Sequence, residues 1–134
     1  MATKEGEIVL WLTFELEAPI YGPMKLLIVI LKDYSKIEEL LLAFLELEVT
    51  GTTVIEGQGM GQIIGDVPIF AGLRGLFPGS AHNSYVMLSV VTEAQVDPCI
   101  GTIEDLCGPL GQPSTGIVFT VPIGDVRGIK ETIR

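Results

Sequence analysis

The feature that most constrains the fold is a single segment, residues 24–32, which reads M-K-L-L-I-V-I-L-K. It is apolar on both faces of an extended chain and β-branched in its middle. Strands that are covered on both sides have this continuous apolar pattern, whereas half-exposed strands alternate. The segment is therefore predicted to be a strand at the centre of a sheet.

A helix and a second strand are predicted directly after this strand. Residues 35–47 have a capping-box pattern at Ser35 and Glu38 and a helical spacing of apolar side chains. The inner face that this spacing predicts contains Ile37, Leu40, Leu41, Phe44 and Leu45. Gly51 turns the chain into a β-rich run at residues 52–56, which completes a β-α-β unit.

The second half of the chain repeats this order. Residues 84–92 are strand-like, and Asp97 is expected to cap a helix whose first residue is Pro98 and which ends at Gly108. The inner face of that helix is expected to contain Cys99, Ile103 and either Leu106 or Cys107. A glycine-rich turn then leads into a last strand, residues 117–123.

Two β-α-β units of similar length predict an α+β fold, the ferredoxin-like βαββαβ sandwich, with both helices on one face of an antiparallel sheet. The other sheet face must then be covered, and 48% hydrophobic residues in 134 agree with burial at a subunit interface. One domain is expected over residues 24–134. Residues 1–23 are interpreted as an N-terminal extension, in which the alternating pattern of residues 8–17 could form an added strand.

The two units are joined by a long glycine-rich connection, residues 57–83. Connections of this length without periodicity are uncommon in a small domain unless they are functional or disordered. This one has few charges, only Asp66 and Arg74 with His82 titratable, so it is expected to fold back or to dock on another protein. Its apolar side chains either bind a partner or pack against their own oligomer. They are Ile63, Ile64, Phe70, Leu73, Leu76 and Phe77.

Composition argues against several classes of function. A net charge of −9 opposes nucleic-acid binding. No apolar run reaches the roughly 18 residues of a membrane span. The N-terminus lacks a signal-peptide pattern, so a cytoplasmic protein is expected. Two cysteines and one histidine make a poor metal set, and no base and nucleophile stand at a catalytic spacing, so neither a metal site nor an enzyme is expected.

Several pieces of the chain together resemble the P-II signal-transduction proteins. They are the strand M-K-L-L-I-V-I-L-K, the run T-G-T-T-V-I-E-G-Q-G-M-G, the long connection and the final T-G-I-V-F-T-V-P-I. The resemblance extends from about Met24 to Lys130. It implies a homotrimer that binds adenine nucleotides between its subunits. It also implies action on a target protein, often a membrane transporter or an enzyme, through the long connection, which that family calls the T-loop.

The resemblance also implies ligand contacts at matching positions. The residues that would surround the nucleotide and its phosphates are Ile30, Thr53, Gly59, Gly61, Gly116, Arg127 and Lys130. Their chemistry agrees with this role, because glycine lets backbone N–H groups approach an anion and basic side chains neutralise it. From the residues alone, Arg127 and Lys130 can also be interpreted as part of a charged tail.

The chain departs from the classical family pattern at four places. Arg127 stands one residue away from the usual basic position of that family. Gln62 and Ile63 stand where classical members have Arg-Gln, so the magnesium and 2-oxoglutarate site of that family is not expected. Ile117 replaces a lysine, so AMP, ADP or a cyclic dinucleotide is as suitable a ligand as ATP. Residues 57–83 contain no tyrosine to match the modified one of the family. The chain is therefore interpreted as a divergent P-II-like protein.

Three functional hypotheses follow. The leading one is a cytoplasmic homotrimeric sensor that binds an adenine nucleotide or a related small ligand and relays its state through residues 57–83. The alternative is a structural or interaction trimer that resembles the divalent-cation tolerance proteins and does not bind nucleotide. A third is that the long connection, bound to a partner, responds to bicarbonate or another small anion.

Overall fold

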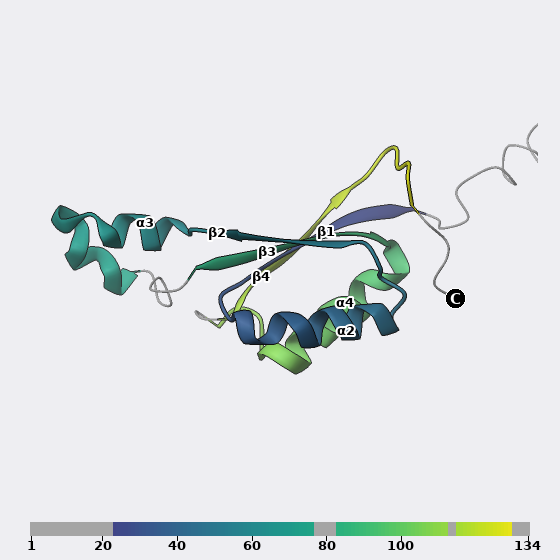
Figure 1. The fold of residues 1–134 in the computed structure, drawn as a ribbon, viewed down its shortest axis with the longest axis horizontal. Coiled ribbons are helices and arrows are strands. Elements are labelled where there is room, and N and C mark those ends of the chain that lie inside the picture. Colours follow the sequence, from purple (N-terminus) through teal and green to yellow (C-terminus); the bar gives the residue numbers. More distant parts are fainter. Residues whose placement is uncertain (1–22, 77–82, 113–114, 130–134) are drawn as a thin grey trace, which may run out of the picture.

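The structure, a computed structural model, describes residues 23–76, 83–112 and 115–129, without the side chains at positions 70, 71, 74 and 75 (Figure 1). Its elements are β1 (Met24–Leu31), the 3-10 turn η1 (Tyr34–Lys36), α2 (Ile37–Glu46), β2 (Thr52–Gly57), α3 (Met60–Asp66), the 3-10 helix η2 (Pro68–Leu76), β3 (Ser84–Thr92), α4 (Glu93–Cys107) and β4 (Gly116–Pro122). The alternating pattern at residues 8–17 lies outside the described residues.

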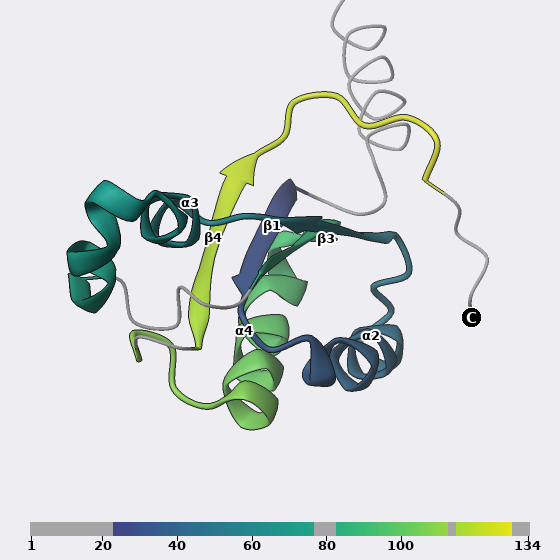
Figure 2. The same ribbon diagram turned by 60° about the vertical axis from the view of Figure 1, so that its left-hand side comes forward.

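The strands form one antiparallel sheet of four in the order β2-β3-β1-β4. β1 pairs with β3 on one side and with β4 on the other, so the prediction of a central strand at residues 24–32 is confirmed. The helices α2 and α4 lie side by side across one face of the sheet (Figure 2). The predicted ferredoxin-like α+β fold is therefore confirmed.

The hydrophobic core lies between the sheet and the two helices. Leu27, Val29 and Leu31 of β1 are buried, because alternate side chains of a strand point to the same face. Met87 of β3 is opposite Val29 and is also fully buried. The remaining buried apolar residues are Ile37, Leu40, Phe44, Val49, Val91, Cys99 and Ile103. Both helices thus contribute inner-face residues that the sequence pattern predicted.

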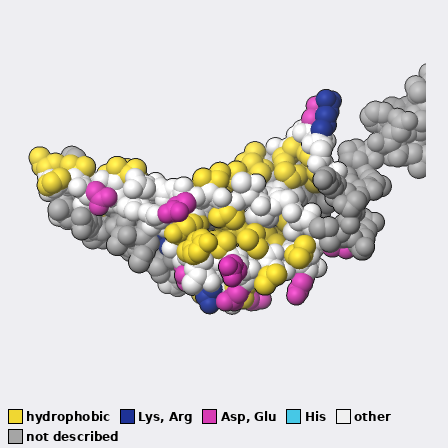
Figure 3. Space-filling model, viewed as in Figure 1, with side chains coloured by type: hydrophobic (Ala, Val, Ile, Leu, Met, Phe, Trp, Pro, Cys, Tyr) yellow, Lys and Arg dark blue, Asp and Glu magenta, His cyan; other side chains and the backbone are white. Residues whose placement is uncertain are grey.

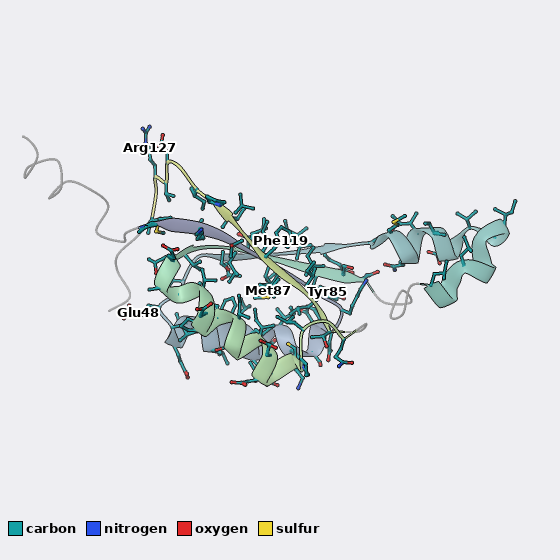
Figure 4. All side chains as sticks on the ribbon, turned by 180° about the vertical axis from the view of Figure 1, so that it is seen from behind. Glu48, Tyr85, Met87, Phe119 and Arg127 are labelled. Atoms are coloured by element: carbon teal, nitrogen blue, oxygen red, sulfur yellow. The ribbon has the colours of Figure 1, made fainter. Side chains whose placement is uncertain are left out.

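The opposite face of the sheet is apolar, and no described element covers it. Figure 4 labels Phe119 on this side of the sheet and Met87 on the helix side. We call this surface the open face; its apolar residues are Leu26, Ile28, Ile30, Ile55, Val86, Leu88, Val90, Ile117, Phe119 and Val121. An apolar surface that extends over every strand is typical of an interaction site.

The start of α2 differs from the prediction of a capping box between Ser35 and Glu38. The side chain of Asp33 accepts hydrogen bonds from the backbone N–H and the hydroxyl of Ser35, at 2.9 and 2.6 Å. Because the hydroxyl is used in this turn, α2 begins later, at Ile37, without a side-chain cap. Leu45, predicted to be in the core, is 44% exposed because it lies at the edge of the inner face.

The start of α4 was also predicted wrongly, with Asp97 as the cap and Pro98 as the first residue. The helix begins at Glu93, and Thr92 caps it in a capping box with Gln95. The side chain of Gln95 accepts a hydrogen bond from the backbone N–H of Thr92 at 2.8 Å. This reciprocal pair satisfies two free backbone donors, which favours the earlier start. Pro98 therefore lies inside the helix on an exposed position, where water can bond the carbonyl that it frees.

The connection between β2 and β3, expected as a long loop that folds back or docks on another protein, contains two helical segments. These are α3 and η2, which contact each other and project beyond the end of the sheet (Figure 1). We call residues 60–76 the arm. The buried residues of α3 are Gly61 and Gly65, one helical turn apart. The inner face of this helix is therefore made by glycines, which a search for large apolar side chains does not detect.

Candidate functional site

A lysine, a serine and a glycine meet where the arm leaves the sheet. Gly59 is the N-cap of α3, and a Cβ built on it would lie 3.1 Å from the Nζ atom of Lys32 and 3.3 Å from the Oγ atom of Ser84. Lys32 donates a hydrogen bond to the Ser84 hydroxyl at 3.1 Å. The absence of a side chain at Gly59 thus lets the ammonium group of Lys32 lie close to the backbone, and a positive charge beside glycine backbone suits an anion.

Lys32 was not predicted as a ligand contact. It follows the last residue of β1, Leu31, which is opposite Tyr85 near the start of β3. Ser84 is the neighbour of Tyr85, so strand register brings Lys32 to the arm. The sequence did contain one indication of its location. A basic residue that directly follows a central apolar strand must lie at the end of the sheet where that strand stops.

Three further polar side chains join the arm to the two strands that carry it. Gln62 of α3 donates a hydrogen bond from Nε2 to the Oδ1 atom of Asn83, at 2.7 Å. Asn83, just before β3, donates from Nδ2 to the Oε1 atom of Glu56 in β2. The Oε1 atom of Gln62 is buried and has no hydrogen-bond partner among the residues that the structure describes. The arm base is therefore held by side chains that were not predicted from the sequence.

Gly116 begins β4, one residue earlier than the predicted strand, and is opposite Leu31. Its φ is +141°, and a Cβ built on it would lie 2.1 Å from the carbonyl oxygen of Ile30. The close contact between β1 and β4 by itself requires a glycine here. Because Leu31 precedes Lys32, Gly116 lies at the same end of the sheet as the arm.

The other predicted contacts in the sheet and arm lie in different surroundings. Ile30 is on the open face, where it is opposite Val86 and Ile117. Thr53 is exposed on the edge strand β2. Gly61 is buried in α3 and is not accessible to a ligand from solvent in the single chain. Ile30 and Thr53 thus lie on the open face, whereas Gly59 lies beside Lys32.

Arg127 lies at the opposite end of the sheet from the arm, and it is exposed (Figure 4). It follows Ile123, whose backbone N–H bonds the carbonyl of Met24 at the first residue of β1. With about 3.3 Å per strand residue, the two ends of β1 are roughly 23 Å apart. A single chain therefore does not bring Arg127 to Gly59. The second predicted basic residue, Lys130, lies outside the described residues.

The arm presents exposed apolar side chains (Figure 3). Of the predicted partner-binding residues, Ile63, Leu73 and Leu76 are 52%, 40% and 71% exposed, and Ile64 is half-buried. The side chain of Phe70 and the whole of Phe77 are not described. Three exposed residues were not predicted: Met60, Val67 and Ile69. With the others they fall at helical spacings of three and four residues on α3 and on η2.

The chemistry of the described residues offers no reactive thiol and no metal cluster. Burial raises the pKa of Cys99 to about 11, and burial with the nearby carboxylate of Asp33 raises that of Cys107. Both cysteines are free. Among residues 23–76, 83–112 and 115–129, no group of three or more His, Cys, Asp or Glu side chains could hold a metal ion. No helix of this described part is long and apolar enough to span a membrane.

Comparisons with known proteins agree with the fold. The family model for the nitrogen regulatory protein P-II matches residues 24–132. A solved structure, that of Arabidopsis thaliana PII bound to citrate, matches with a TM-score of 0.54 and 21% identity over 81% of this chain and 84% of that one. No curated protein matches. P-II proteins are regulatory proteins that form homotrimers and interact with target proteins. The chain belongs to the nitrogen regulatory protein P-II family.

Proposed function

We propose that this P-II family protein senses an adenine nucleotide, or a related small ligand, at clefts between the subunits of a homotrimer. The ligand state is relayed through the arm to a target protein, for which a membrane transporter is one candidate. The observation that carries the proposal is the contact of Gly59 with Lys32, because it puts an ammonium group against glycine backbone directly before the first residue of the arm.

The ligand is proposed to be anionic. Lys32, at 3.1 Å from Ser84, supplies a positive charge at the arm end of one subunit. Arg127 lies at the other end of the same chain, and it is proposed to reach the ligand from a neighbouring subunit. Lys130 would accompany it. Because Ile117 provides no charge next to Gly116, AMP, ADP and cyclic dinucleotides are as suitable as ATP.

Oligomerisation is supported by the open face. Phe119 and Ile117 are 42% and 55% exposed there, and no described element covers them. A second and a third copy would bury this surface and would form the clefts that join Arg127 of one subunit to Lys32 of another. Cytoplasmic location belongs to the same proposal, and no membrane-spanning helix was found among the described residues.

The relay would work by differential binding. A ligand shifts the arm between two orientations only as far as its affinities for those two states differ. Gly59 belongs both to the proposed ligand contact and to the start of α3, so a ligand there contacts the element that moves.

Isothermal titration of the full chain with AMP, ADP, ATP and cyclic di-AMP tests the proposal. We expect saturable binding of at least one of them, and at least tenfold weaker binding in Arg127→Ala. Lys36→Ala is the matched control, since it removes a positive charge from η1, and it should leave the affinity unchanged. Absence of saturable heat with all four ligands would contradict the sensor and favour the structural trimer.

A further inference from the structure

We propose that Gln62, Asn83 and Glu56 form a latch that sets the orientation of the arm relative to the sheet. The hydrogen bonds run from Gln62 to Asn83, at 2.7 Å, and from Asn83 to Glu56. The three residues belong to α3, to the segment that enters β3 and to β2. The latch therefore connects the first turn of the arm to both strands between which the arm is inserted.

The two hydrogen bonds of the latch can run in only one donor-to-acceptor direction, which we call its polarity. An ionised carboxylate only accepts hydrogen bonds, so Glu56 requires the Nδ2 donor of Asn83. The Oδ1 acceptor of Asn83 must then face Gln62, whose Nε2 group must donate. Reversing either amide would place two acceptors or two donors against each other. Each side chain thus has one compatible arrangement, and the closed state is a defined one.

Two glycines lie in the backbone at the base of the arm. The chain enters the arm through Gly57 and Gly59, on either side of Gln58. A Cβ at Gly57 would meet no atom within 4 Å, so space around this residue is open. Glycines allow rotation that other residues resist. Beyond the last backbone pair of the sheet, Gly57 with Ser84, side-chain bonds therefore contribute to holding the arm at this angle.

One atom of the closed latch favours opening. The Oε1 atom of Gln62 is buried without a hydrogen-bond partner among the described residues. A buried acceptor without a partner disfavours the state that buries it, and opening exposes this atom to water. The latch is consequently a balance between two hydrogen bonds that close it and one unsatisfied acceptor that opposes them.

Isosteric substitutions test the polarity of the latch without any ligand, so the result does not depend on nucleotide binding. Asn83→Asp removes the donor to Glu56, and Gln62→Glu removes the donor to Asn83. Glu56→Gln is the matched control, because its Oε1 atom still accepts from Asn83. The readout is hydrogen–deuterium exchange of the backbone amides of α3, measured by mass spectrometry on the full chain. The exchange of the β1 amides reports the stability of the sheet.

We expect α3 to exchange about tenfold faster in Asn83→Asp and in Gln62→Glu, which corresponds to the loss of about 1.4 kcal/mol, or one net hydrogen bond. Exchange in Glu56→Gln should equal that of the wild type, and β1 should be unchanged in all variants. If α3 exchanges at the wild-type rate in both Asn83→Asp and Gln62→Glu, the proposed latch is contradicted. Equal acceleration in Glu56→Gln would overturn its polarity. If Asn83→Asp also accelerates β1, Gln62→Glu, on the arm itself, decides alone.

Discussion

The carbonyl oxygen of Ile30 lies 2.1 Å from the position that a Cβ on Gly116 would occupy. Since φ of Gly116 is +141°, both the space and the backbone conformation exclude a side chain. We expect Gly116→Ala to lower the free energy of unfolding by more than about 2 kcal/mol, because β4 must move away from β1. Urea denaturation of the variant measures this loss.

Gly124 provides the control for that prediction. A Cβ at Gly124 would meet no atom within 4 Å, and its φ is not in the left-handed region. Gly124→Ala should therefore change the free energy of unfolding by no more than about 0.5 kcal/mol. Equal effects of the two substitutions would show that the contact with Ile30 does not determine the requirement for glycine.

A second prediction concerns Glu48, which follows α2 with a φ of +65° (Figure 4). The helix ends with the N–H of Val49 bonded to the carbonyl of Phe44 at 2.8 Å, a motif that usually has glycine in the left-handed position. Glu48→Gly removes the strain of about 1–2 kcal/mol but adds entropy to the unfolded chain, so we expect a net gain of about 0.5–1 kcal/mol. Thermal unfolding measures the gain. Glu48→Ala keeps the strain and should give none.

The residue pattern within a single segment was enough to predict some of the strands and helices. The apolar run of β1 and, except for Leu45, the inner face of α2 are of this kind, and both were predicted in position. The start of α4 was missed because Pro98 is a strong helix-start signal, whereas the pair Thr92 and Gln95 satisfies more backbone donors. The arm was missed because its helix buries glycines.

The candidate site was predicted less completely because pairing of distant strands creates it. Lys32 and Ser84 are 52 residues apart in sequence and meet only through the register of β1 with β3. Glu56 and Asn83 are likewise joined across the base of the arm. Glycines such as Gly59 could be predicted from a motif, whereas the side chains around them depend on the tertiary fold. The roles of the predicted ligand residues stay predictions.

The open face leads to a prediction about assembly. Phe119 is on this face and is 42% exposed in the single chain. Phe119→Asp should convert the proposed trimer into monomers, because it would place a charge in an interface that excludes water. Sedimentation velocity distinguishes the two. Leu42→Asp is the control, since Leu42 is on the outer side of α2 and is 64% exposed, and it should leave the trimer intact. Dissociation of both variants, or of neither, would contradict the assignment of the interface.

Stability at alkaline pH is expected to depend on Cys99. Burial raises the pKa of this thiol from 9.0 to about 11. Between these two pH values the folded chain keeps a proton that the unfolded chain loses. The contribution of the buried Cys99 thiol to the free energy of unfolding is therefore complete below pH 9 and is lost between pH 9 and 11. The loss should reach about 2–3 kcal/mol. Urea denaturation at several pH values measures the free energy of unfolding of the wild type and of Cys99→Ala. We expect the excess of the wild type over the variant to decrease as the pH rises from 9 to 11. A constant difference would contradict the shift.

The central claim is that a ligand at the intersubunit clefts changes the state of the arm. Hydrogen–deuterium exchange of α3 in the full-length wild type, with and without a saturating amount of the nucleotide that binds most tightly, tests this claim most directly. We predict a change of at least threefold in the exchange rates of residues 60–66, with β1 unaffected. Saturable binding that leaves the exchange of the arm unchanged would contradict the relay.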